Sequence, residues 1–170
     1  MTPINWDEAL SFGITELDDD HQTLVELVNQ LEAQSLARAG REAVGATLAR
    51  LVGAVGRHIE HENELLERYG YTDTADHRVL DRKFFQIFLD VQQVFEEHGV
   101  LNAETRDFIE HLIIQHILKT DAPLRQFFRK LQRVPDSNDY IHCKRREEKT
   151  HQEAQSECQP EARRSRRNNG

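Results

Sequence analysis

Several side chains that can bind a metal ion fall on the apolar faces of this chain's predicted helices. The stretch RHIEHENELLERYGY, residues 57–71, shows the pattern. Apolar positions such as Leu51 and Val55 recur at steps of three and four, and the same steps lead to His58 and Glu62. A His and a Glu four residues apart lie on one helix face and can hold a single cation. Because a buried ionised Glu is costly unless it is paired or bound to a metal, this face holds either a hydrogen-bonded core pair or a pair of metal ligands.

The polar neighbours of this pair fall elsewhere on the helix. We expect Glu60 and Glu64 to be solvated, and His61 to lie at the surface, at the edge of the apolar face. The segment HENEL, residues 61–65, begins like the zinc-hydrolase pattern H-E-x-x-H but has Leu65 in place of the second histidine. A zinc hydrolase is therefore disfavoured.

Each of four predicted helices places a potential metal ligand on its apolar face. The set is His21; His58 and Glu62; His77 and Asp81; and His116, followed at the fifth residue by Asp121. Facing His, Asp and Glu side chains in a helical bundle form carboxylate-bridged di-metal sites. Imidazole and carboxylate without thiolate suit iron or manganese, with zinc as a competitor. The alternative is a set of core histidines, each hydrogen-bonded independently.

The apolar periodicity predicts four helices with short connections, after an irregular arm at residues 1–16. We expect helices over 17–37, ending at Gly40; over about 42–68, ending at Gly70; from the capping residues Thr72, Asp73 and Thr74 to Gly99; and from about Asn102. Pro123 removes a helical hydrogen bond, so we expect a kink there, or a break before a short helix to about Leu131. With no strand-like alternation, the prediction is an all-α, up-down-up-down four-helix bundle.

Composition divides the chain into two parts. Its 170 residues carry a net charge of −8, with 38% hydrophobic and 31% charged residues. Residues 134–170 hold eight basic and seven acidic residues, which leaves −9 for residues 1–133. We predict a bundle domain at 1–133 and a charged, disordered tail at 134–170. The acidic domain argues against nucleic-acid binding, and with no signal peptide or membrane span in the sequence we expect a cytoplasmic monomer.

The order and spacing of the motifs resemble the bacterial hemerythrin family. The resembling features are Trp6, FGITELDDDH at 12–21, Asn29, HIEHE at 58–62, YGYTDTADH at 69–77 and HILKTD at 116–121. The resemblance covers about residues 4–131. It implies a four-helix bundle with a non-haem di-iron centre that binds dioxygen reversibly.

The resemblance also implies a role for each matching position. His21 and His58 would bind one iron, His77 and His116 would bind the other, and Glu62 and Asp121 would bridge both ions.

Three positions depart from the family pattern. Asp81 stands where the family has a second histidine four residues after His77, Leu112 replaces a tryptophan, and Pro123 follows Asp121 by two residues. Asp81 either replaces the histidine as a ligand or points away and leaves an open coordination site.

Two functions follow from this set of residues, and a metal-free structural bundle is a further alternative. The first is an oxygen-binding protein for storage, delivery or sensing, with a small apolar pocket lined by Leu24, Val28, Ile59, Phe84, Ile113 and Ile117. The second is a di-iron redox enzyme acting on peroxide or nitric oxide, which Asp81 favours. No core residue resembles a general acid or base for an organic substrate, so we expect the first function and no enzymatic activity.

Overall fold

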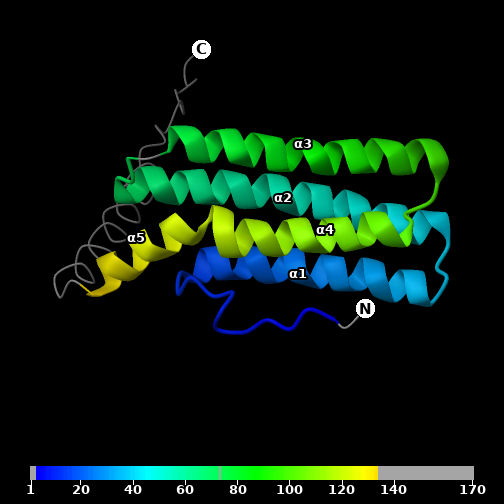
Figure 1. Cartoon of the computed structure of the whole chain (residues 1–170), viewed down its shortest axis with the longest axis horizontal. Coiled ribbons are helices and arrows are strands. Elements are labelled where there is room, and N and C mark those ends of the chain that lie inside the picture. Colours follow the sequence, from blue (N-terminus) through cyan, green and yellow to red (C-terminus); the bar gives the residue numbers. More distant parts are fainter. Residues whose placement is uncertain (1–2, 73, 134–170) are drawn as a thin grey trace, which may run out of the picture. The chain divides into compact units, whose positions relative to one another are not determined.

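The computed structural model describes residues 3–72 and 74–133, and in these residues every regular element is helical. The elements are α1 (Thr15–Leu36), α2 (Arg41–Tyr69), α3 (Ala75–His98), α4 (Ala103–Gln115), the π-helical η1 (His116–Thr120) and α5 (Ala122–Arg133). Helices α1 to α4 lie side by side and alternate in direction along the chain (Figure 1). The predicted all-α, up-down-up-down four-helix bundle is confirmed.

The chain divides into two units, Met1–Arg129 and Lys130–Gly170, and the bundle belongs to the first. The predicted tail, residues 134–170, lies outside the described residues, so its disorder stays a prediction. Within residues 3–72 and 74–133, each helix is too short or too polar to cross a bilayer.

The apolar faces expected from the periodicity form the core of the bundle. Its fully buried members include Leu17, Leu24, Leu48, Leu51, Val55, Leu66, Phe88, Ile109 and Ile113. Each fully buried aliphatic or aromatic side chain contributes about 1.5–3 kcal/mol. This apolar layer is interrupted at one level by polar residues, which make up the site described below.

Glycines end two of the helices and connect them to the next. Gly70 and Gly99 follow α2 and α3 with φ of 71° and 72°, the left-handed conformation that glycine adopts without strain. Asn102 begins α4, where its side chain accepts a hydrogen bond from the Thr105 amide at 2.8 Å. These ends agree with the sequence prediction.

Two helix ends differ from the prediction. Helix α1 ends at Leu36 rather than continuing to Gly40, because Arg38 takes the left-handed conformation with φ of 52°. Gly40 instead precedes α2 in an extended conformation. Thr74 lies at the N-cap of α3 but makes no side-chain capping hydrogen bond, and Asp73 lies outside the described residues.

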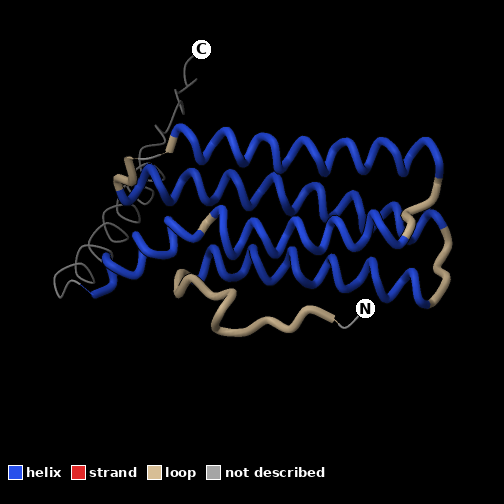
Figure 2. Tube along the Cα trace, in the orientation of Figure 1, coloured by secondary structure: helices blue, strands red, loops and turns tan. Residues whose placement is uncertain are grey.

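The arm before α1 has no regular structure from residue 3 to Ile14 and lies along the outside of the bundle (Figure 2). Asn29 pairs with the backbone of Ile4 through two hydrogen bonds of 2.9 Å. Asp18 accepts hydrogen bonds from the Ser11 hydroxyl at 2.8 Å and from the amides of Phe12 and Gly13 at 2.6 and 3.0 Å. The first turn of α1 therefore fixes the end of the arm.

Candidate metal centre

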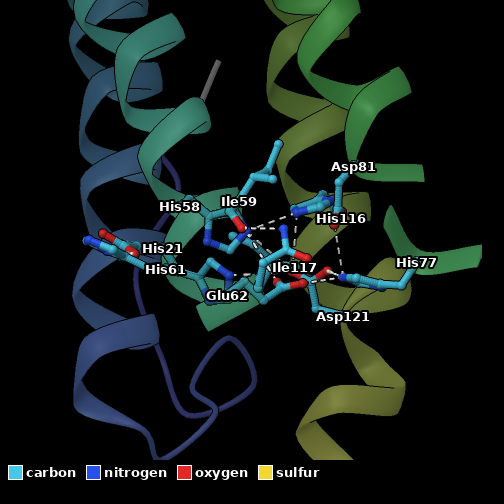
Figure 3. A network of polar contacts seen from close by, with 12 residues as sticks. His21, His58, Ile59, His61, Glu62, His77, Asp81, His116, Ile117 and Asp121 are labelled. Atoms are coloured by element: carbon cyan, nitrogen blue, oxygen red, sulfur yellow. Dashed lines mark hydrogen bonds and ion pairs between the residues drawn. The ribbon is translucent and has the colours of Figure 1, made fainter. Parts of the chain in front are cut away.

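All six predicted metal ligands, and Asp81 with them, come together in the interior of the bundle, near the end at which α1 and α3 begin (Figure 3). The residues and their exposed fractions are His21 0%, His58 0%, Glu62 1%, His77 7%, Asp81 1%, His116 2% and Asp121 0%. Glu60, His61 and Glu64 are exposed, as predicted. His61 Nδ1 lies 2.8 Å from Asp20 Oδ2 at the surface.

Two of the helices each contribute a pair of ligands at a spacing of four residues. On α2, His58 Nε2 lies 3.6 Å from Glu62 Oε2, and on α3, His77 Nε2 lies 3.4 Å from Asp81 Oδ2. Residues four apart are neighbours on an α-helix, so the regular helix is sufficient to place both pairs. The period of the apolar face predicted these four positions.

His116 and Asp121 are five residues apart, and a π-helical turn places them together. The Asp121 amide donates to the His116 carbonyl at 3.1 Å, which closes a ring one residue longer than in an α-helix. His116 Nε2 then lies 3.4 Å from Asp121 Oδ2. Asp121 itself has φ of −90° and ψ of 0°, a sparsely populated conformation common at functional sites.

The π turn explains how the chain accommodates Pro123. The predicted break is present, because α4 ends at Gln115 and α5 begins at Ala122. Pro123 is the second residue of α5, where an amide would have no intrahelical partner, so its missing N–H costs little. The π-helical segment was not predicted; the spacing of five between two ligand-type residues was its signal in the sequence.

The two acidic residues at the centre each offer one oxygen to each side of the site. Glu62 directs Oε1 to His77, in a very short contact, and Oε2 to His58. Asp121 Oδ1 lies 3.9 Å from His77 Nε2, whereas Oδ2 lies 3.5 Å from His21 Nε2. This is the placement that two bridging carboxylates require.

The ligand atoms accordingly form two groups, within each of which all lie within 4.8 Å of one another. The first ligand group is His58, Glu62, His116 and Asp121, and the second ligand group is Glu62, His77, Asp81 and Asp121. His21 lies beside the first group through its approach to Asp121.

The position of His116 differs from the role that the resemblance implies. Its Nε2 lies 3.0 Å from His58 Nε2, so it belongs with His58 here rather than with His77. The His116 ring stacks on Phe84, with centroids 3.9 Å apart and planes within 5°. This stacking, which the sequence did not reveal, fixes the ring on the side of the first ligand group.

The buried polar atoms of the site fit bound cations. Among the described residues, no hydrogen-bond partner exists for either ring nitrogen of His21, either oxygen of Asp81 or Asp121, or Glu62 Oε2. Buried polar atoms are nearly always paired, and a buried carboxylate without a partner is expensive. Two divalent cations among these atoms would remove that cost.

The pKa values of three of the site's histidines are lowered, and that of the fourth is raised. Burial lowers the pKa of His21 to about 4 and that of His116 to about 3, and it lowers the pKa of His58 well below its ordinary value. These rings are therefore neutral and keep a lone pair for a metal. Burial also disfavours the charged form of His77, but its hydrogen bond to Glu62 and the nearby carboxylate charges outweigh it and raise the pKa to about 9.

The carboxylates show the opposite shift. Burial, together with the charge of Asp121, raises the pKa of Glu62 to about 7. Burial, together with the charge of Glu62, raises the pKa of Asp81 to about 7, and burial raises the pKa of Asp121 well above its ordinary value. Three carboxylates buried together hold protons in the absence of a cation, and a bound metal would displace them.

Apolar side chains surround the polar cluster. Leu24, Val28, Phe84, Ile113 and Ile117 are buried as predicted, whereas Ile59 is half-buried. The small cavity that these residues are expected to line stays a prediction. From the arm, the Phe12 ring lies 4.9 Å from the His21 ring, and the Arg125 guanidinium lies over the Phe12 ring, 4.7 Å from its centroid.

Known proteins are similar to this chain in sequence. Residues 13–131 match the Hemerythrin HHE cation binding domain. The chain is 30% identical over 124 residues to the bacteriohemerythrin of Methylococcus capsulatus, covering 71% of this chain and 93% of that protein. It is 28% identical to a hemerythrin-like protein of Naegleria gruberi, covering 71% of this chain and 89% of that protein.

Solved structures agree with the sequence comparison. The crystal structure of wild-type hemerythrin superposes with a TM-score of 0.62 at 28% identity, covering 71% of this chain and 93% of that one. A point mutant of hemerythrin superposes with a TM-score of 0.64 at the same identity and coverage. With its bundle, its buried histidines and its carboxylates in the matching segment, this chain belongs to the hemerythrin HHE cation-binding family.

Proposed function

We propose that this protein holds two non-haem iron ions and binds dioxygen, for storage, delivery or sensing. The observation that carries the proposal is the pair of central carboxylates, Glu62 and Asp121, each of which presents one oxygen to each ligand group. Bridging carboxylates of this kind, between helices that supply histidines, are the common design of di-iron sites in bundles. Family membership supports iron as the metal.

Each residue has a distinct part in this proposal. His21, His58 and His116, held neutral by burial, would supply nitrogen ligands beside the first ligand group, and His77 would supply nitrogen in the second. Glu62 and Asp121 would hold the two ions together. The pair of irons, when bound, supplies the electrons for reversible dioxygen binding. The protein keeps water away with buried apolar side chains such as Phe84 and Ile117.

A redox enzyme acting on peroxide or nitric oxide is the second candidate, and Asp81 is the observation that favours it. The side chain is buried within the cluster rather than turned to solvent. An anionic neighbour stabilises a ferric ion more than a ferrous ion, because the Coulomb energy scales with the charge of the metal. A site that is oxidised easily suits turnover better than reversible binding.

The test is metal analysis of protein produced with added iron, followed by absorption spectra of the reduced protein under argon, in air, and under argon again. We expect about two irons per chain, the number that the two ligand groups would hold, and a visible band that appears in air and disappears under argon. Bound iron without a reversible band, together with consumption of added peroxide or nitric oxide, would support the enzyme. Protein without iron after this preparation would contradict both functions.

We also propose a cytoplasmic monomer, for which size-exclusion chromatography and cell fractionation are the tests.

A further inference from the structure

We propose that Asp81 is itself a metal ligand, and that it makes the second ligand group an oxygen-rich position with a preference for Mn²⁺ over Fe²⁺ relative to the same position with a histidine. The inference rests on the two-metal centre of the proposed function. It goes further by assigning a ligand and a metal preference to one of the two positions.

The first argument is the direction of the side chain. Asp81 Oδ2 lies 3.4 Å from His77 Nε2, and one Asp81 oxygen lies within 4.8 Å of ligand atoms of Glu62, His77 and Asp121 (Figure 3). Only 1% of the residue is exposed. The sequence left two orientations for the Asp81 side chain, into the cluster or away from it, and the structure has the first.

The second argument is the lack of any other partner. Neither Asp81 oxygen finds a hydrogen bond within residues 3–72 and 74–133, although both are buried. Burial of an ionised carboxylate without hydrogen bonds is unfavourable unless a cation compensates its charge. Within the described part of the chain the His77 ring, 3.4 Å from Asp81 Oδ2, is the charged neighbour of Asp81 and makes no hydrogen bond to it, whereas a metal ion would satisfy both oxygens.

The third argument is the difference between the two ligand groups. The second ligand group contains one imidazole and three carboxylates, whereas the first contains two imidazoles and two carboxylates, with His21 close by. Imidazole suits iron and zinc, and carboxylate oxygen suits harder ions such as manganese. The exchange of a neutral nitrogen donor for an anionic oxygen donor at residue 81 therefore moves this position toward manganese.

A surface hollow lies beside this position. It lies beside α2 and α3, has a volume of about 270 Å³, and is lined by Asp81 together with Ile59, Asn63, Arg78, Arg82 and Phe85. Arg78 is held at the rim by Asn63 at 2.9 Å and by Glu67 at 2.6 Å. Asp81 lines this hollow although its carboxylate oxygens are buried, so solvent comes close to the second ligand group on this side of the bundle.

The experiment measures metal affinity in the full-length chain after treatment with a chelator. Under argon, Mn²⁺ is titrated and its free six-line electron paramagnetic resonance signal is followed, and Fe²⁺ is then added in competition. The variants are Asp81→His and Asp81→Asn. The matched control is Asp90→Asn, which changes an exposed aspartate on the same helix, one that accepts a hydrogen bond from the Gln86 side chain at 2.8 Å.

We expect Asp81→His to lower the affinity for Mn²⁺ relative to Fe²⁺ by roughly tenfold or more, the scale of loss seen when a metal-site contact is altered. Asp81→Asn should bind one Mn²⁺ fewer than the wild-type chain, and Asp90→Asn should behave as the wild type. Circular dichroism checks that each variant is helical, and if Asp81→His does not fold, the Mn²⁺ stoichiometry of Asp81→Asn decides the question.

An unchanged Mn²⁺ to Fe²⁺ ratio in Asp81→His, with two ions still bound, would overturn this inference and leave the proposed function intact. Full retention of Mn²⁺ affinity in Asp81→Asn would overturn it equally. A shifted ratio without a reversible band in air would support the inference and contradict the oxygen-binding function. A wild-type chain that binds neither ion would overturn both.

Discussion

Glu62 lies between the two ligand groups, with Oε1 directed to His77 and Oε2 to His58. Loss of this carboxylate should therefore weaken both metal positions together. We expect Glu62→Ala to lose most of its bound metal, because the variant removes an anionic ligand from each ion at once. Metal content by elemental analysis, after production with added iron, is the measurement.

The control for this prediction lies close by on the same helix. Glu60 is exposed, so Glu60→Ala should keep the metal content of the wild type. Equal metal content in the two variants would show that Glu62 does not bridge the ions.

Protonation of the acidic ligands gives a second prediction at the level of residues. In the metal-free chain the pKa values of Glu62 and Asp81 are raised to about 7 and that of His77 to about 9. Metal binding at pH 6 must expel protons from all three, whereas at pH 8 Glu62 and Asp81 have already lost theirs and His77 still holds one. Zn²⁺ affinity should therefore rise from pH 6 to pH 8, and fewer protons should be released at pH 8.

Isothermal titration calorimetry in two buffers of different ionisation enthalpy counts these protons. Equal proton release at pH 6 and pH 8 would mean that the carboxylates are already ionised at pH 6, contrary to the raised pKa values.

Most of the site could be predicted from the sequence because its residues follow the period of an α-helix. His58 with Glu62 and His77 with Asp81 stand at the spacing of four that a regular helix places on one face. The position of His116 could not be predicted in the same way, since its ring is fixed by stacking on Phe84, a contact between residues 32 positions apart in the chain.

At the level of elements, the arm and α1 form one structural unit through Asp18. Its carboxylate accepts three hydrogen bonds from Ser11, Phe12 and Gly13, and Phe12 in turn lies against His21. Asp18→Ala should lower the free energy of unfolding by about 1–3 kcal/mol, because it leaves backbone amides without their acceptor. It should also increase amide hydrogen exchange at Phe12.

Urea denaturation and hydrogen exchange are the measurements, and Asp19→Ala is the control. Asp19 is exposed and lies next to Asp18 near the start of the same helix, so its removal changes the helix dipole interaction by a similar amount but leaves the arm in place. If the two variants unfold at the same urea concentration, Asp18 does not fix the arm.

The helices themselves were predicted well, and the connections less well. The end of α1 at Leu36 depends on Arg38 in the left-handed conformation, which is uncommon for a residue other than glycine and gave no signal in the sequence. Gly40 was the more obvious candidate for the end of the helix, but its φ of −66° is ordinary for any residue.

At the level of the whole molecule, the bundle and the site lie entirely within the first 133 residues. Every ligand-type residue of the two groups falls between His58 and Asp121, and the buried core extends from Leu10 to Phe128. We therefore expect a chain ending at Arg133 to fold and to bind the same amount of metal as the full-length chain.

Far-UV circular dichroism, the thermal midpoint and metal content of both chains are the measurements. A shortened chain that is unfolded, or that has lost its metal, would show that residues 134–170 are required by the bundle.

The π-helical turn also determines where this protein tolerates a change in length. The turn from His116 to Asp121 contains one residue more than an α-helical turn, so deletion of Leu118, which is 37% exposed, should let it close as an ordinary turn. The histidine and aspartate would then be four residues apart and still share a face. Deletion of the exposed Gly53 should instead rotate the rest of α2 by about 100° and turn His58 and Glu62 away from the core. The variant without Leu118 should keep its metal content, and the variant without Gly53 should lose it. Loss of metal from the variant without Leu118 would mean that the extra residue of the turn is itself required to hold the ions.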